Sequence, residues 1–193
     1  MAAARRAGWG SDPAPGAEGS EPRMALDRSS DDFFMGEALR QAVQALESGE
    51  VPVGAVIARG GRIIARAHNQ TELLKDPTAH AEMIAITQAA AEIGDWRLNG
   101  CTLYVTKEPC AMCAGAIVLA RFERLVFGAA DARRGGAVSA FGILSDPRLN
   151  HHPEVAGGVE EAAARSLLQE FFRMRRAQEK LAENAPGEGD QSN

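Results

Sequence analysis

The chain has 193 residues, of which 45% are hydrophobic and 24% charged, and its formal net charge is −5. This length and composition suit one globular domain with flexible ends, and no apolar run reaches the roughly 18 residues that a membrane-spanning helix needs. We therefore expect a soluble, cytoplasmic protein. The acidic balance gives no support for nucleic-acid binding, although a local basic patch would suffice for it.

The two ends differ in composition from the middle of the chain. Residues 1–28 are rich in Ala, Gly, Pro, Ser and Asp and lack apolar periodicity, which predicts a disordered extension. Residues 182–193 are again polar and contain Gly and Pro, which predicts a disordered tail. The sequence thus predicts one domain over residues 29–181.

Helical and strand patterns alternate within this domain. Ser30 can cap a helix that runs to about Ser48 with its apolar residues on one face. The next predicted elements are strands 53–58 and 63–67, a loop 69–78, helix 79–93, strand 102–106, helix 110–120, strand 125–128, a short strand near 155 and a final helix from about 160. A tight turn is expected at Gly60 and Gly61. This order predicts a three-layer α/β/α domain, with helices on both faces of a central mixed sheet of about five strands.

Two short segments, His-Ala-Glu and Pro-Cys-Ala-Met-Cys, carry residues suited to metal chemistry. His80 offers an imidazole nitrogen, and Cys110 and Cys113 offer two thiols. A catalytic zinc site uses three protein ligands and leaves one position open for water. The two cysteines lie three residues apart at the start of a predicted helix, which places them on one face and favours the thiolate form. Glu82 lies close enough to take a proton from a metal-activated water and return it, without binding the metal.

Each segment alone is ambiguous. A His-x-Glu pair is common, and a Cys-x-x-Cys pair at a helix start divides between metal binding, redox exchange and ordinary packing. A redox interpretation leaves His80 and Glu82 without a role, and Cys101 is expected to be a core residue. Together, the two segments at a separation of about thirty residues are the signature of zinc nucleobase deaminases.

Beyond this signature, the chain resembles the bacterial tRNA-specific adenosine deaminases, which belong to the cytidine deaminase-like superfamily. The resemblance spans about residues 33–176. It is carried by the segments Glu-Val-Pro-Val-Gly-Ala-Val at 50–56, Asp-Pro-Thr-Ala-His-Ala-Glu at 76–82, Thr-Leu-Tyr-Val-Thr at 102–106 and Phe-Phe-Arg-Met-Arg-Arg at 171–176. The last segment matters most, because a general zinc deaminase needs no such tail.

The resemblance implies conversion of the wobble adenosine of an arginine tRNA anticodon to inosine, with release of ammonia and with one zinc ion per subunit. It also implies a homodimer that binds the anticodon stem-loop. The substrate-binding residues that it implies are Asn69, Ala81 through its backbone, Asp131, Arg133, Phe172 and Arg176. One departure is Ala130, where the family often has a basic residue, although Arg134 adds a positive charge further along.

Two other functions remain open at this point. A zinc deaminase of a free base or nucleoside, of the guanine or cytosine type, would share the metal and Glu82 but would need no arginine-rich last helix. A non-catalytic RNA-binding subunit would have no reason to keep Glu82. The cluster of Arg173, Arg175, Arg176 and Lys180 suits phosphate contacts, but it equally suits a solvated helix face.

Overall fold

The structure, a computed structural model, describes residues 30–183. Its elements are α1 (Asp31–Glu47), β1 (Gly54–Arg59), β2 (Arg62–His68), α2 (Thr71–Leu74), α3 (Ala81–Ile93), β3 (Cys101–Lys107), α4 (Ala111–Leu119), β4 (Arg124–Ala129), the 3-10 turn η1 (Ile143–Ser145), β5 (Glu154–Gly157) and α5 (Glu161–Glu183). The predicted extension 1–28 lies outside the described residues. The same holds for the predicted tail from residue 184 onwards, while residues 182 and 183 form the end of α5.

The five strands form one mixed sheet in the order β2-β1-β3-β4-β5. Strand β1 runs antiparallel to both β2 and β3, whereas β3, β4 and β5 are parallel to one another. Gly60 and Gly61 both have positive φ angles, of 56° and 76°, as a tight two-residue hairpin turn requires. The predicted mixed sheet of five strands is therefore confirmed.

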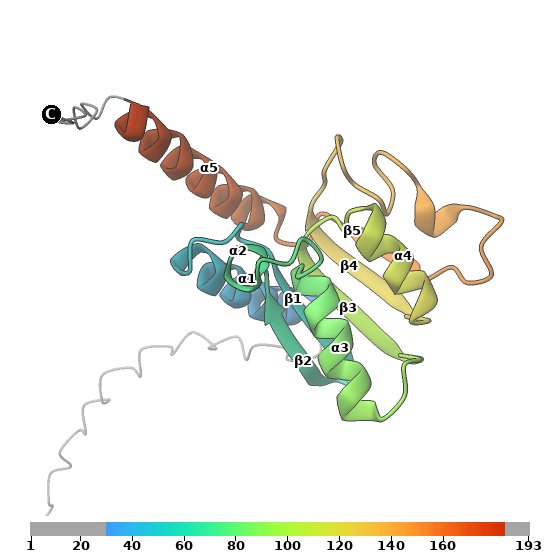
Figure 1. Ribbon diagram of the computed structural model, residues 1–193. Helices are drawn as coiled ribbons and strands as arrows, with labels where there is room; N and C mark the ends of the chain where they lie inside the picture. Colours follow the sequence, from blue (N-terminus) through green and yellow to red (C-terminus); the bar gives the residue numbers. More distant parts are fainter. Residues whose placement is uncertain (1–29, 184–193) are drawn as a thin grey trace, which may run out of the picture.

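Helices cover both faces of this sheet (Figure 1). Along β1, Ala55 and Ile57 belong to the core beneath α3 and α4, whereas Val56 and Ala58 belong to the core beneath α1. This alternation follows from the period of two in a strand, and a strand that is apolar on both faces must be covered on both. The predicted three-layer α/β/α arrangement is confirmed.

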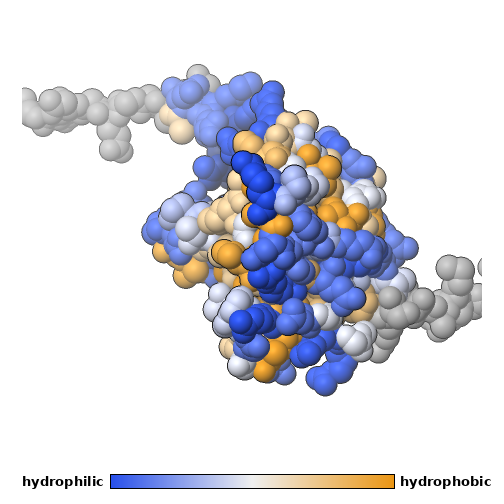
Figure 2. All heavy atoms as spheres, turned by 90° about the vertical axis from the view of Figure 1, so that its right-hand side faces the viewer, coloured by the Kyte–Doolittle hydropathy of each residue, from blue (hydrophilic) through white to orange (hydrophobic). Residues whose placement is uncertain are grey.

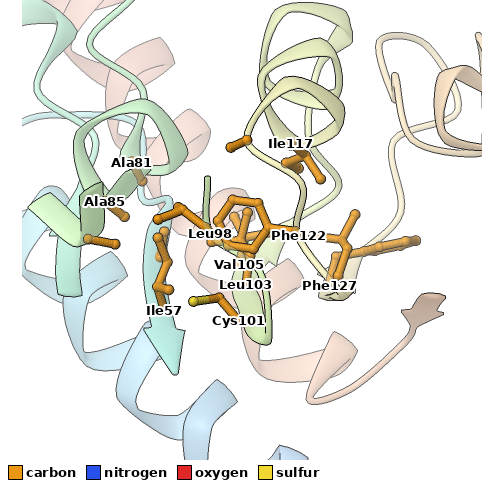
Figure 3. Packing of buried hydrophobic residues seen from close by; sticks show 14 of the residues in the cluster. Ile57, Ala81, Ala85, Leu98, Cys101, Leu103, Val105, Ile117, Phe122 and Phe127 are labelled. Carbon is orange, nitrogen blue, oxygen red and sulfur yellow. The ribbon is translucent and has the colours of Figure 1, made fainter. Parts of the chain in front are cut away.

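The larger core lies between the sheet and helices α3 and α4. Figure 3 shows the ring of Phe122 among Leu98, Leu103 and Val105, and all four side chains are fully buried. Cys101 is also fully buried, as expected from its position at a strand start, and burial raises the pKa of its thiol. This core fixes the starts of α3 and α4 relative to the sheet.

Helix α1 packs closely on the opposite face. Ser30 caps it by accepting a hydrogen bond from the Phe33 N–H at 3.2 Å, as predicted. The backbone of Gly54 comes so near that a Cβ there would lie 2.0 Å from the carbonyl oxygen of Ala38. Only glycine permits this approach of helix to strand.

Helix α5 begins against the sheet and then extends beyond it (Figure 1). Ala164 and Phe171 are its buried residues, and the part beyond Phe172 is exposed. Within residues 30–183, no helix is both long and apolar enough to cross a lipid bilayer.

Candidate metal centre and active-site cleft

Three side chains that could hold a metal ion meet where two helices begin. His80 is the N-cap residue of α3, and Cys110 is the N-cap residue of α4, with Cys113 in its first turn. The Nδ1 atom of His80 lies 3.6 Å from the Sγ atom of Cys110 and 3.5 Å from that of Cys113. The three donor atoms lie within 4.8 Å of one another. The structure thus brings together the three residues that the sequence singles out as ligands.

Hydrogen bonds couple the protonation of these three groups. A hydrogen bond from the Cys113 thiol, together with one from His80, lowers the pKa of Cys110 to about 3. The hydrogen bond to Cys110 and burial raise the pKa of Cys113, which keeps the proton. The hydrogen bond to the Cys110 thiolate also raises the pKa of His80. The group therefore already carries a thiolate, which is the form of cysteine that binds a metal.

Glu82 is a buried carboxyl group beside these three residues. It lies in the first turn of α3, is 3% exposed and lines the same cleft as His80 and Cys110. Burial raises its pKa, and it is not one of the three grouped donors. Its position suits a group that exchanges protons next to a metal site rather than one that coordinates the metal.

His80, Cys110 and Glu82 line a cleft of about 570 Å³. We call residues 69–74 the first wall and residues 131–139 the second wall. The lining residues are Val51, Val53, Asn69, Thr71, His80, Glu82, Lys107, Glu108, Cys110, Asp131, Arg133, Arg134, Leu168 and Phe172. Four of the six predicted substrate-binding residues, Asn69, Asp131, Arg133 and Phe172, therefore share one cleft with the candidate metal centre.

The other two predicted substrate-binding residues lie near the cleft without lining it. Ala81 is the first residue of α3, between His80 and Glu82, where backbone N–H groups have no partner within the helix. Arg176 lies one helical turn beyond Phe172 on the exposed part of α5. Phe172 is 47% exposed, whereas Phe171 is buried, as expected.

Glu108 holds the second wall in place. Its carboxylate is 2% exposed and accepts hydrogen bonds from the N–H groups of Asp131 at 2.9 Å, Val138 at 2.9 Å and Ser139 at 2.8 Å. A Cβ on Gly135 would lie 2.4 Å from the Glu108 carboxyl carbon, so this close approach requires glycine.

The second wall is also tied to the metal-binding segment through the backbone. The Gly136 N–H donates to the Pro109 carbonyl at 2.7 Å, and Cys110 forms an isolated β-bridge with Gly135. These bonds therefore hold the second wall next to Cys110, a candidate metal ligand.

Several cleft residues escaped the sequence analysis. Lys107 forms an ion pair with Asp131. Burial opposes ionisation of Asp131, but Lys107 and the backbone N–H groups of Arg133 and Arg134 outweigh it and lower the Asp131 pKa. The buried carboxylates of Glu50 and Glu108 were also missed. Both lie next to predicted strands, yet their partners lie about 20 to 30 residues further along the chain.

Sequence comparison places the chain among known deaminases. The MafB19-like deaminase family matches residues 29–176. Over 154 residues the chain is 48% identical to the tRNA-specific adenosine deaminase of Bacillus subtilis (strain 168), which covers 80% of this chain and 96% of that protein. Over 142 residues it is 51% identical to that of Aquifex aeolicus (strain VF5), which covers 74% and 93%. The chain belongs to the tRNA-specific adenosine deaminase family.

Solved structures agree with membership in the tRNA-specific adenosine deaminase family. A structure from work on A-to-I editing by tRNA:A34 deaminases at the wobble position is 46% identical, with a TM-score of 0.68 over 70% of this chain and 98% of that chain. Guanine deaminase from Nitrosomonas europaea has a TM-score of 0.63 over 82% and 97%, but at 22% identity it is similar in fold alone. The predicted cytidine deaminase-like fold is confirmed, and the chain is a hydrolytic deaminase.

Proposed function

We propose that this chain converts the wobble adenosine of an arginine tRNA anticodon to inosine and releases ammonia. The relatives at 48% and 51% identity are tRNA-specific adenosine deaminases, and the 46% identical structure comes from work on wobble editing. The observation that carries the proposal is that one cleft is lined by His80 and Cys110, which meet Cys113, by the buried Glu82 and by a wall with Arg133. The reaction takes place in the cytoplasm, where such a tRNA substrate is found.

The donor set fits zinc, and we propose one zinc ion per subunit. Tetrahedral zinc holds an imidazole nitrogen and a thiolate sulfur about 3.6 Å apart. The distances from His80 Nδ1 to the Cys110 and Cys113 sulfurs are 3.6 and 3.5 Å. Three protein ligands would leave a fourth position open for water, and a zinc ion held by these residues would lower the pKa of that water to roughly 7.

Glu82 is assigned the proton transfers. In hydrolytic deamination, water adds to the purine carbon that bears the amine, the bond from this carbon to the amine nitrogen breaks, and ammonia leaves. The Glu82 carboxylate accepts the proton that the attacking water gives up and delivers it to the departing amine. Its burial keeps bulk water from competing for this proton.

Base recognition is assigned to Asn69, the backbone N–H of Ala81 and the ring of Phe172. A buried amide beside a cleft can bond the edge of an extruded base, and an aromatic ring at the mouth can stack on an unpaired one. Asn69 is 6% exposed and Phe172 is 47% exposed, which suits a contact in the interior and one at the mouth.

Contacts with the sugars and phosphates are assigned to Asp131, Arg133 and Arg176. Arg133 and Arg134 place positive charge on the second wall, and Arg176 extends it along α5. Arginine side chains are suited to phosphate oxygens. Lys107 compensates the charge of Asp131, so this carboxylate does not repel the RNA backbone as a lone anion would.

We include a homodimer in the proposal. The face that carries α4 has apolar residues among hydrophilic ones (Figure 2), and Leu119, Val138 and Phe141 are 72%, 57% and 63% exposed. Side chains of this kind favour burial against a partner. Sedimentation of the purified protein is expected to give twice the mass of one chain, and a monomer over the whole concentration range would contradict the dimer.

The test uses an arginine tRNA transcript with a wobble adenosine. The zinc-loaded protein is incubated with the transcript, and the cDNA is sequenced, because inosine is read as guanosine. A change from adenosine to guanosine at that one position is expected. No change there, with ammonia released instead from free guanine, cytosine or adenosine, would assign the protein to the free-base or nucleoside deaminases.

A further inference from the structure

Glu50 is a buried carboxylate for which the proposed reaction has no direct role. It lies between α1 and β1 and is 1% exposed. Its Oε1 atom accepts a hydrogen bond from the Leu73 N–H at 2.8 Å. Its Oε2 atom accepts from the Thr71 hydroxyl at 3.1 Å and faces the Asn69 amide nitrogen at 3.5 Å. All three donors belong to the first wall of the cleft.

These contacts give the Asn69 amide one direction. An ionised carboxylate can only accept hydrogen bonds, so the single hydroxyl proton of Thr71 is committed to Glu50. Towards Asn69, the same hydroxyl oxygen can then only accept, and the Asn69 Nδ2 atom donates to it at 3.1 Å. A flipped Asn69 amide would place its Oδ1 atom against two acceptors and would lose this hydrogen bond.

Glu50 remains charged under ordinary conditions. Burial alone would raise its pKa, but hydrogen bonds from the backbone of Leu73 and Glu72 and from the side chains of Thr71 and Asn69 outweigh burial and lower the pKa. At neutral pH the Glu50 carboxylate can therefore only accept hydrogen bonds, as the fixed direction of the Thr71 hydroxyl requires.

We propose that Glu50 is a positioning residue for base recognition, which acts through Thr71 to fix the direction of the Asn69 amide. Both N–H directions of the Asn69 amide then point to Thr71 and Glu50, and Asn69 offers the base its carbonyl oxygen in a fixed place. A site of fixed polarity discriminates strongly, because a wrong base leaves buried polar groups unpaired. The proposal rests on the proposed function, which assigns Asn69 to the base.

The test is a double-mutant cycle on kcat/KM with an anticodon stem-loop RNA. Glu50→Gln replaces one acceptor oxygen by a donor and permits the flipped amide, so we expect kcat/KM to fall roughly tenfold or more. In an Asn69→Ala background, the same substitution is expected to cause little further loss. Zinc content and thermal denaturation are measured for each variant, because a merely structural role would act equally in both backgrounds.

Two further variants sharpen the test. Thr71→Val removes the connecting hydroxyl but leaves the bond from the Leu73 N–H to Glu50, and it should reproduce the same coupling with Asn69 even if Glu50→Gln fails to fold. Glu72→Gln is the matched control. It removes the same charge from the same segment at a side chain that is 66% exposed, and kcat/KM should stay unchanged.

The outcomes separate this inference from the proposed function. A Glu50→Gln or Thr71→Val penalty that is equally large without Asn69 would overturn the inference, and so would a fully active Thr71→Val variant. Failure of the wild-type protein to make inosine would appear before any variant is compared. That result would overturn the proposed function and this inference with it.

Discussion

The proposed chemistry of the cleft depends on a few side chains at the starts of α3 and α4. His80 and Cys110 occupy the N-cap positions of α3 and α4, where the partial positive charge of the helix end stabilises a thiolate. Two such ends repel a metal cation, but two thiolates offset this repulsion. The arrangement favours a metal only while both cysteines are present.

Glu82→Gln should abolish most of the activity and keep the metal. The amide has nearly the same shape as the carboxylate but cannot take a proton from water, so we expect kcat to fall by roughly 10² to 10⁴-fold. Single-turnover kinetics, with metal content and RNA affinity measured in parallel, check this. A variant with full metal content and substantial turnover would show that another group moves the proton.

The grouping of His80, Cys110 and Cys113 could be predicted from the sequence, whereas the carboxylates that hold the cleft walls could not. Cys110 and Cys113 meet because a helix brings residues three apart onto one face, which is a local rule. Glu108 acts on backbone N–H groups 23 to 31 residues away, and Glu50 acts on Leu73. Backbone donors carry no sequence signal, so such partners are visible only in the fold.

Among the elements, the sheet and the long helices followed the sequence closely. Strand 53–58 was predicted and Gly54–Arg59 is observed, and helix 110–120 was predicted and Ala111–Leu119 is observed. The segment predicted as loop 69–78 contains the four-residue helix α2. Four residues are too few to show a helical period, and this helix depends on Glu50, which accepts the Leu73 N–H from outside the segment.

The contact between α1 and β1 makes Gly54 sensitive to substitution. Gly54→Ala would force a Cβ to within 2.0 Å of the Ala38 carbonyl oxygen, so helix and strand must separate, at a cost of about 3 kcal/mol in the free energy of unfolding. Gly36→Ala is the matched control, because nothing lies within 4 Å of its Cβ and α1 should gain about 0.5 to 1 kcal/mol. Urea denaturation measures both. Equal effects of the two substitutions would contradict the close approach.

The start of α1 is also tied to the sheet by charge. Asp31 accepts hydrogen bonds from Arg124 at 2.6 and 2.9 Å and from the Tyr104 hydroxyl at 3.0 Å, and the bonds from Arg124 are the main reason that the Asp31 pKa is lowered. Burial is the main reason that the Tyr104 pKa is raised to about 12.

Asp31→Asn should therefore destabilise the protein in a pH-dependent way. Because the Asp31 pKa is lower in the folded chain, its contribution is fully present above 3.8, the ordinary value, and is lost as the pH falls further. Both partners are partly exposed, so the contribution is about 1 kcal/mol. Urea unfolding of wild type and variant over a pH series checks this. A difference that stays constant below 3.8 would contradict the prediction.

On the scale of the whole molecule, an acidic protein is proposed to bind a polyanion. The formal net charge of −5 opposes RNA binding, so the attraction must come from a restricted region. Such a basic region lies beside the cleft. It consists of Arg133 and Arg134 on the second wall and of the arginines of α5. The net charge could not have predicted this basic region, because it sums the charges of the whole chain.

Arg176→Ala should weaken RNA binding most at low salt. A lost phosphate contact reduces the number of counterions released, so the slope of log affinity against log salt should become shallower by about 0.7 to 0.9. Arg62→Ala is the control, since Arg62 lies on the hairpin at the end of β1 remote from Asn69. Fluorescence anisotropy over a salt series measures both. Identical slopes for Arg176→Ala and wild type would show that Arg176 is only a surface charge.

The link between the second wall and Cys110 has a thermodynamic consequence. Glu108 holds Asp131, and Gly136 bonds to Pro109, which precedes Cys110, so a displacement of the wall would move this proposed metal ligand with it. Occupancy of the metal site and affinity for the polynucleotide are then coupled, and the coupling must act equally in both directions. At equilibrium, bound RNA should raise the affinity for the metal by the same factor by which bound metal raises the affinity for the RNA.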